Sequence, residues 1–123
     1  MKKDEFSPFR HTMSKIKDRY KYYNYKGRNR QEVHITLQDL KDQWDLQEGK
    51  CPICGVKLIL KTNSNKKNVT CNPYQASLDR VDSDKPYEKG NIRFVSLMAN
   101  YAKNNFTDEQ LIDFCGKVIK THS

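Results

Sequence analysis

The chain has 123 residues, of which 23 are Lys or Arg and 15 are Asp or Glu, so its net charge is +8 at pH 7. This length suits one domain, and a hydrophobic content of 36% permits only a small core. No apolar run is long enough to span a membrane, and the opening Met-Lys-Lys-Asp-Glu lacks the apolar core of a signal peptide. We therefore expect a cytoplasmic protein without a membrane partner.

The basic excess is concentrated toward the N-terminus. Residues 1–34 contain ten Lys or Arg and four Asp or Glu, whereas residues 35–123 contain 13 and 11. This bias favours a polyanionic partner, of which nucleic acid is the commonest, although a basic surface that meets only solvent is the alternative. We expect a basic N-terminal helical extension over residues 1–34 and a core with a C-terminal helix over residues 35–123.

The first expected element is an amphipathic helix over residues 8–25. Its apolar side chains recur at steps of four and three residues, with Lys and Arg between them. For the aromatic stripe we favour core packing over stacking on bases, and we assign nucleic-acid contact to the basic face, which includes Lys17 and Lys21. The apolar stripe comprises Phe9, Met13, Ile16, Tyr20 and Tyr23.

A second helix is expected to begin after Thr36, whose hydroxyl can cap the first turn, and to end before Gly49. Leu37, Leu40 and Trp44 follow one another at helical spacing. This pattern predicts that Trp44 packs in the core and does not bind a ligand.

Next comes a Cys-Pro-Ile-Cys-Gly segment, in which Cys51 and Cys54 have the spacing of half a zinc knuckle. A structural Zn²⁺ held by these two thiols and undetermined partners is one interpretation, and an apolar Cys pair in a tight turn is the other. Cys71 lies at the far end of an exposed loop expected over residues 62–72, and Cys115 lies on the apolar face of a later helix, where we expect a buried thiol. A short strand is expected from the alternation of Val56, Leu58 and Leu60.

The stretch from Ser77 onward changes its pattern three times. A short run around Asp79 is followed by a turn-rich loop, then by alternation from Ile92 to Val95, and then by helical spacing through Asn100. This order predicts strand, loop, strand and helix, in which Asp79 of the first strand and Asn100 of the helix point at one spot. Two such ligands suffice for Mg²⁺, which keeps most of its waters and takes other ligands from a substrate phosphate.

This stretch resembles the HNH nuclease family, whose ββα-metal core carries an Asp-His pair, then an Asn, then a His or Asn on the helix. Asp79 matches the metal-binding Asp, and Arg80 falls at the position of the general-base His. Asn91 matches the middle Asn, and Asn100 matches the helix ligand. The gaps of 11 positions from Arg80 to Asn91 and 9 positions from Asn91 to Asn100 fit the family. The chain is also similar to a phage and bacterial subgroup whose pair reads Asp-Arg. The resemblance covers residues 35 to 117.

The resemblance implies an α+β fold with a ββα-metal core and flanking helices, and hydrolysis of DNA phosphodiester bonds with Mg²⁺ or Mn²⁺ and no small-molecule cofactor. It implies that Asp79 and Asn100 hold the ion. Arg93 and Lys103 would contact DNA. Asn91 would brace the hairpin by hydrogen bonds to backbone groups across the loop, a positioning role beside the chemistry.

Arg80 is the departure from the family, because a guanidinium stays charged and cannot take a proton from water. Three interpretations are open. Arg80 clamps the phosphate while another group or a metal-bound hydroxide supplies the nucleophile, which we favour; or a histidine or Glu88 acts as the base; or the site no longer cuts. The candidate histidines are His11, His34 and His122.

A final helix is predicted by Thr107 and Gln110, which form a capping-box signature ahead of apolar residues at helical spacing. We expect this helix to close the domain.

The leading expectation for function is a metal-dependent HNH endonuclease that nicks or cuts DNA. The alternative is a non-catalytic nucleic-acid-binding module on a degenerate HNH fold, and a third interpretation is a zinc-knuckle adaptor for protein partners. Cutting of both strands by so small a domain would need two copies, so a homodimer is possible, but no stretch of sequence is an obvious dimer interface.

Overall fold

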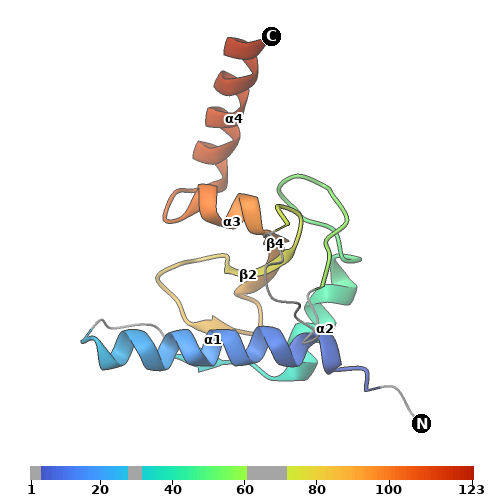
Figure 1. The fold of residues 1–123 in the computed structure, drawn as a ribbon, viewed down its shortest axis with the longest axis vertical. Helices are drawn as coiled ribbons and strands as arrows, with labels where there is room; N and C mark the ends of the chain where they lie inside the picture. The colour runs from blue at the N-terminus through green and yellow to red at the C-terminus, as the bar shows by residue number, and fades with distance from the viewer. Residues whose placement is uncertain (1–3, 28–31, 61–71) are drawn as a thin grey trace.

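The fold is known from a computed structural model, which describes residues 4–27, 32–60 and 72–123 (Figure 1). Within these residues there are four helices and two two-stranded sheets, which confirms the predicted α+β class. None of the helices in these ranges is long and apolar enough to cross a membrane. The elements in chain order are α1 (Ser7–Tyr25), β1 (Val33–His34), α2 (Leu37–Leu46), β2 (Ala76–Arg80), β3 (Tyr87–Glu88), β4 (Ile92–Ser96), α3 (Leu97–Lys103) and α4 (Asp108–His122).

The apolar stripe of α1 packs in the core, as predicted, over its first half. Phe9, Met13 and Ile16 are buried in one hydrophobic cluster with residues of α2, β2 and β4. Lys17 and Lys21 lie on the exposed side of the helix. The N-terminal helix and the rest of the described chain therefore share a single core.

The second helix begins and ends as the sequence predicts. Thr36 Oγ1 accepts a hydrogen bond from the Asp39 N–H at 3.1 Å, and the Asp39 carboxylate accepts one from the Thr36 N–H at 2.9 Å. Trp44 packs edge-on against Phe94 with ring centroids 5.2 Å apart, so it is a core residue. Gly49 has a φ of +67°, and a Cβ there would lie 2.9 Å from the Trp44 ring. Both the backbone conformation and the close approach therefore require glycine.

The two longest strands, β2 and β4, pair antiparallel, and α3 begins directly after β4. Leu78 lies opposite Phe94 in the core, and Asp79 lies opposite Arg93. Ser96 caps α3, since its Oγ accepts a hydrogen bond from a backbone N–H of the first turn at 3.1 Å. The predicted order of strand, loop, strand and helix is present, and it brings the ends of β2 and α3 together.

One side chain holds the loop between β2 and β4. Asn91 is buried, and its Oδ1 accepts a hydrogen bond from the Asp82 N–H at 2.8 Å. Its Nδ2 donates to the carbonyl oxygens of Asp82 and Pro86 at 3.1 and 2.9 Å. These contacts agree with the prediction that Asn91 braces the hairpin by bonding backbone groups across the loop.

The prediction of a strand from Val56 to Leu60 is wrong. This segment forms only two isolated bridges among the described residues, Lys50 with Lys57 and Ile59 with Gln75, one antiparallel and one parallel. Because each bridge has a different partner segment, no continuous ladder forms, even though the alternation leaves Leu58 buried. The loop predicted over residues 62–72 and Cys71 lie almost wholly outside the described residues.

The last helix has the predicted capping box but does not close the domain. Thr107 Oγ1 accepts from the Gln110 N–H at 3.1 Å, and the Gln110 side chain accepts from the Thr107 N–H at 2.9 Å. The chain turns at Asn104, whose φ is +46°, and α4 then projects away from the body (Figure 1). Leu111 is buried, but Cys115 is exposed, which corrects the prediction of a buried thiol.

Replacing Asn91 by Ala should lower the free energy of unfolding by about 2–3 kcal/mol, because several backbone groups of the loop lose their partner. Urea unfolding followed by circular dichroism measures this change. Asn24→Ala is the matched control, since Asn24 makes one exposed bond, to the Tyr20 carbonyl within α1. An Asn91→Ala effect no larger than that of the control would contradict the bracing role.

Candidate functional site

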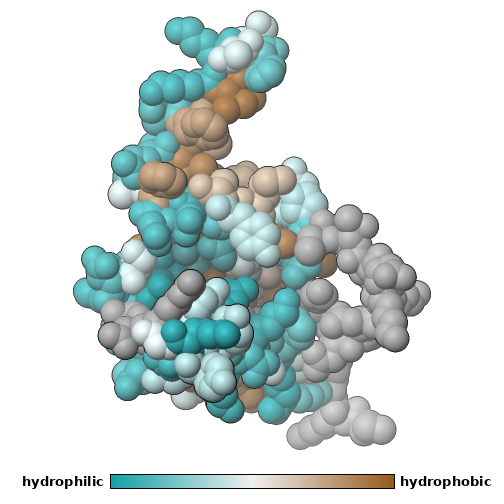
Figure 2. All heavy atoms as spheres, turned by 60° about the vertical axis from the view of Figure 1, so that its left-hand side comes forward, coloured by the Kyte–Doolittle hydropathy of each residue, from teal (hydrophilic) through white to brown (hydrophobic). Residues whose placement is uncertain are grey.

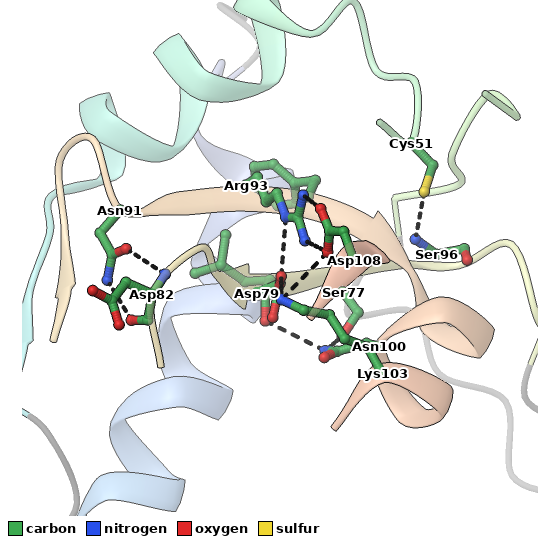
Figure 3. Close-up of polar contacts among 12 residues, drawn as sticks. Cys51, Ser77, Asp79, Asp82, Asn91, Arg93, Ser96, Asn100, Lys103 and Asp108 are labelled. Atoms are coloured by element: carbon green, nitrogen blue, oxygen red, sulfur yellow. Dashed lines mark hydrogen bonds and ion pairs between the residues drawn. The ribbon is translucent and has the colours of Figure 1, made fainter. Parts of the chain in front are cut away.

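The candidate site is built around the carboxylate of Asp79, which β2 holds close to β4 and α3 (Figure 3). Asp79 Oδ2 accepts a hydrogen bond from Arg93 Nε at 3.0 Å and another from Lys103 Nζ at 3.1 Å. Arg93 reaches it because the two residues are cross-strand neighbours. Lys103 reaches it from the last turn of α3. Both contacts use the same oxygen, so neither cation engages Oδ1.

The ion pairs extend to the start of α4. Arg93 donates from Nη1 and Nη2 to the two carboxylate oxygens of Asp108, at 2.8 and 2.7 Å, and Lys103 Nζ lies 3.7 Å from Asp108. Asp79 and Lys103 are only 8% and 7% exposed. Two cations therefore balance two carboxylates, which is the condition under which buried charges are tolerated.

The geometry of this ion cluster favours the charged forms of Arg93 and Asp108. The hydrogen bonds to Asp108, and after them the interaction with Asp79, raise the pKa of Arg93 above its ordinary value, although burial acts against this shift. In return, the guanidinium of Arg93 lowers the pKa of Asp108 below its ordinary value. Arg93 and Asp108 therefore pair as full charges at neutral pH.

Asn100 lies beside this cluster on α3. Its Nδ2 donates to Ser77 Oγ on β2 at 2.6 Å, and the Leu78 carbonyl lies at 3.5 Å from the same atom. Ser77 and Asp79 are two positions apart on β2, so their side chains share one face of the strand. Asp79 and Asn100, the two predicted metal ligands, also line the same hollow.

This hollow has a volume of about 760 Å³ and is open to solvent. Lys103, Arg80 and Arg19 contribute positive charge to its wall, and the negative charge comes from Asp79, Asp82, Asp108 and Glu109. Arg19 comes from α1, and sequence reasoning did not single it out. The charge of that helix was visible, but the face that would meet the hollow depends on packing. The sequence also gave no sign that Asp108 pairs with Arg93.

Arg80 lines the hollow but is held by the loop. Its Nη1 donates to the Lys85 carbonyl at 3.1 Å, and its guanidinium carbon lies 5.2 Å from the centroid of the Tyr87 ring. Such a contact between a cation and an aromatic face orients the side chain. Arg80 is therefore placed at the rim of the hollow and does not touch Asp79 through any contact in the described part of the chain.

The three candidate histidines differ in whether their surroundings overlap with the hollow. His11 lines a second, smaller hollow that shares Arg19, Leu78 and Tyr101 with the first. His34 bonds to Glu32 at 2.7 Å near the surface, and His122 is at the end of α4. His11 is thus the histidine whose surroundings overlap with those of Asp79.

A divalent ion fits this site by donor type. Within residues 4–27, 32–60 and 72–123, no three His, Cys, Asp or Glu side chains are grouped as a metal site. Mg²⁺, however, needs only one or two protein oxygens when substrate phosphate and water complete its shell. Asp79 Oδ1 and the amide oxygen of Asn100 are such donors. The ammonium of Lys103 on Asp79 opposes a second cation there, so this lysine must move away for the ion to bind.

The turn at Cys51 and Cys54 presents half of a zinc ligand set. Cys51 Sγ is buried and accepts a hydrogen bond from the Ser96 N–H at 3.4 Å, whereas Cys54 is exposed. Burial by itself raises the pKa of the Cys51 thiol, but several hydrogen bonds, mostly from backbone N–H groups, outweigh it and lower the pKa. Cys115 is exposed on the projecting helix, and Cys71 is outside the described residues. The structural Zn²⁺ stays a prediction.

Comparisons with protein-family models, with curated proteins and with solved structures found no match to this chain. The HNH resemblance therefore continues to rest on the motif from Asp79 to Asn100 and on its spacing. The side chains that surround the hollow are the further evidence on function.

Replacing Asp108 by Asn should lower the free energy of unfolding by about 1 kcal/mol at neutral pH, since the Arg93 pair is partly exposed to solvent. The pKa of Asp108 is lower in the folded protein than its ordinary value of about 4, so the carboxylate stabilises the fold above that pH. This contribution is lost as the pH falls through the lowered value. The difference between wild type and Asp108→Asn should therefore shrink below about pH 4.

Urea unfolding of both proteins over a pH series measures this effect. Asp113→Asn is the control, because Asp113 pairs with Lys117 while both side chains are largely exposed. A destabilisation by Asp108→Asn that does not change with pH would count against the ion pair.

Proposed function

We propose that this chain is a metal-dependent endonuclease of the HNH type that hydrolyses DNA phosphodiester bonds. One observation carries the proposal: the carboxylate of Asp79, on β2 of a β2–β4–α3 unit, lines an open hollow together with Asn100 and three cationic side chains, those of Arg19, Arg80 and Lys103. A carboxylate alone would repel a phosphate. Arg19, Arg80 and Lys103 would bind the phosphodiester, and a divalent ion would offset the carboxylates of the hollow.

Asp79 and Asn100 would hold a Mg²⁺ or Mn²⁺ ion through their oxygens. When bound, such an ion stabilises the negative charge that develops on a phosphate during hydrolysis. Lys103, released from Asp79, would donate to a phosphate oxygen close by. Because Lys103 is one turn beyond Asn100 on α3, its released ammonium would remain close to the metal ligands.

Arg80 would act on the phosphate and not on the water. Its guanidinium carries two parallel N–H donors that suit the oxygens of a phosphate, and contact with the Tyr87 ring limits the orientations it must give up on binding. It remains charged at working pH, so the proton of the attacking water goes to another acceptor. His11 is our candidate for that acceptor, since its hollow adjoins that of Asp79.

The second candidate function is a module that binds nucleic acid without cutting it. Its support is the pairing of Asp79 with both Arg93 and Lys103, which gives this carboxylate a structural role without any metal. Both candidate functions would bind DNA through the same cationic side chains, so a binding assay alone does not distinguish them. A cleavage assay does.

The cleavage test uses supercoiled plasmid and bacterial genomic DNA with Mg²⁺, Mn²⁺ or EDTA. We expect nicked or linear products only with metal, and a rate reduced at least about 100-fold in Asn100→Ala and Asp79→Asn. Asn100→Ala leaves the ion cluster intact, so it removes a metal ligand with little risk to folding. Arg80→Ala should cut more slowly while binding DNA as well as the wild type does.

Asp42→Asn is the control for charge, because Asp42 lies exposed on α2 and bonds only to Gln38 in the described part of the chain. Unchanged cleavage in Asn100→Ala would contradict the assignment of the site. Binding without cleavage in either metal would favour the second candidate function.

Phosphate contact by α1 is tested by the salt dependence of DNA binding. Lys17→Ala and Lys21→Ala should each reduce the slope of log affinity against log salt by about 1, since each contact releases about one counterion. Fluorescence anisotropy with a labelled duplex measures this slope. Lys41→Ala on α2, where the lysine pairs with Asp45, removes the same charge and should leave the slope unchanged. Equal slopes in all four proteins would exclude α1 from the interface.

A further inference from the structure

The smaller hollow beside the candidate site differs from the larger one in charge. It has a volume of about 100 Å³, and the two hollows share Arg19, Leu78 and Tyr101 in their walls. Lys15 and Arg19 of α1 bring positive charge to the smaller hollow, and none of its described lining residues is Asp or Glu. A DNA strand that leaves the candidate metal site in this direction would therefore meet cations without carboxylates.

One face of α1 supplies this charge. His11, Lys15 and Arg19 follow one another at steps of four residues, so they lie in one line along the helix, about 6 Å apart along its axis. Lys15 and Arg19 are exposed. Their charges are therefore accessible to a polyanion along the wall of the smaller hollow.

Tyr101 lies where the two hollows meet. Its side chain is 69% exposed, and within the described residues its hydroxyl forms no hydrogen bond and its ring no aromatic or cation–π pair. Tyr101 follows Asn100 on α3, and Lys103 lies on the other side of Asn100 around the helix. The candidate metal ligand is thus flanked by a cation on one side and by an uncovered aromatic ring on the other.

We propose that this junction of the two hollows binds a nucleotide whose base is unpaired, next to the phosphate at the candidate metal site. The base would stack on the ring of Tyr101, and the phosphate of that nucleotide would contact Arg19 and Lys15. In a duplex, neighbouring bases cover both faces of a base, so a protein ring can stack only on a base that has left the helix. The substrate class is therefore DNA with a single-stranded or displaced nucleotide. This inference deepens the proposed function and rests on it for the position of the phosphate that is cut.

The wall of the smaller hollow suits the chemistry of a base. Polar side chains such as Thr12, Gln75 and Ser77 lie among apolar ones there, and a base likewise has polar edges and apolar faces. A volume of about 100 Å³ is below that of pockets for drug-sized ligands, so the smaller hollow has no room for a base pair. Figure 2 shows that the coloured surface of the body below the projecting helix α4 is largely hydrophilic, as expected of a protein that meets a polyanion.

Binding of labelled oligonucleotides in EDTA, followed by fluorescence anisotropy, tests the stacking contact. We expect Tyr101→Ala to bind a short oligothymidine strand at least about fivefold more weakly than wild type, and a duplex within about twofold of wild type. Tyr101→Phe keeps the ring and should bind the single strand as wild type does. Tyr74→Ala is the matched control, because Tyr74 is 45% exposed and lines neither hollow.

A strand with abasic sites, which keeps the phosphates and lacks the bases, completes a double-mutant cycle. Wild type should lose as much affinity on this strand as Tyr101→Ala loses on the normal strand, and Tyr101→Ala should lose nothing further. Arg19→Ala should weaken binding of both strands by the same factor, since it removes a phosphate contact. Equal weakening of the normal and abasic strands by Tyr101→Ala would overturn the stacking. Equal weakening by Tyr101→Ala and Tyr101→Phe would do so too, because the hydroxyl would then make the contact.

The absence of a divalent ion from these assays separates this inference from the proposed function. Metal-dependent cleavage by wild type, together with a Tyr101→Ala defect that is the same on duplex and single strand, would keep the nuclease and overturn the nucleotide site. Binding that depends on both the ring and the base, in a protein that does not cut, would support the nucleotide site and count against the nuclease.

Discussion

The contact of Asp79 with Arg93 and Lys103 joins four elements of this small fold. Asp79 belongs to β2, Arg93 to β4 and Lys103 to α3, and Arg93 continues to Asp108 at the start of α4. Because these charges are largely buried, the pairs must form together for any of them to be tolerated. The same cluster fixes the floor of the hollow and the point from which α4 leaves the body. The candidate site and the arrangement of these four elements therefore depend on the same ion pairs.

The parts of the fold that follow local rules could be predicted from the sequence. Thr36 and Thr107 mark helix starts because their capping partners are only three residues away. Asn91, directly after Gly90 in a turn-rich loop, was expected to brace the hairpin by hydrogen bonds to backbone groups across the loop. Trp44 was placed in the core by helical spacing alone. In each case the deciding contact spans few residues or repeats with a fixed period.

The rest depends on contacts between distant segments. The partners of Asp79 follow from strand register and from the length of α3, and nothing in the spacing of the motif indicates that Lys103 would turn back to β2. The direction of α4 was missed because an apolar face does not reveal which surface covers it. Arg19 was missed for a similar reason, since helical spacing gives a basic face but not its neighbour. The resemblance to the HNH motif supplied the positions of Asp79 and Asn100 but not the ion pairs around them.

Under the proposed function, the pairing of Lys103 with Asp79 would make the stability of the fold independent of metal binding at Asp79. In many small metal-binding domains the empty ligand cluster is strongly repulsive, so the apo form unfolds when the ion is removed. Here a built-in ammonium neutralises the key carboxylate. Loss of a divalent ion from Asp79 should therefore leave the chain folded. Under the proposed function, an arriving polyanion would attract the lysine and free Asp79, so that nucleic acid and metal would load as a cooperative pair, each binding more tightly in the presence of the other.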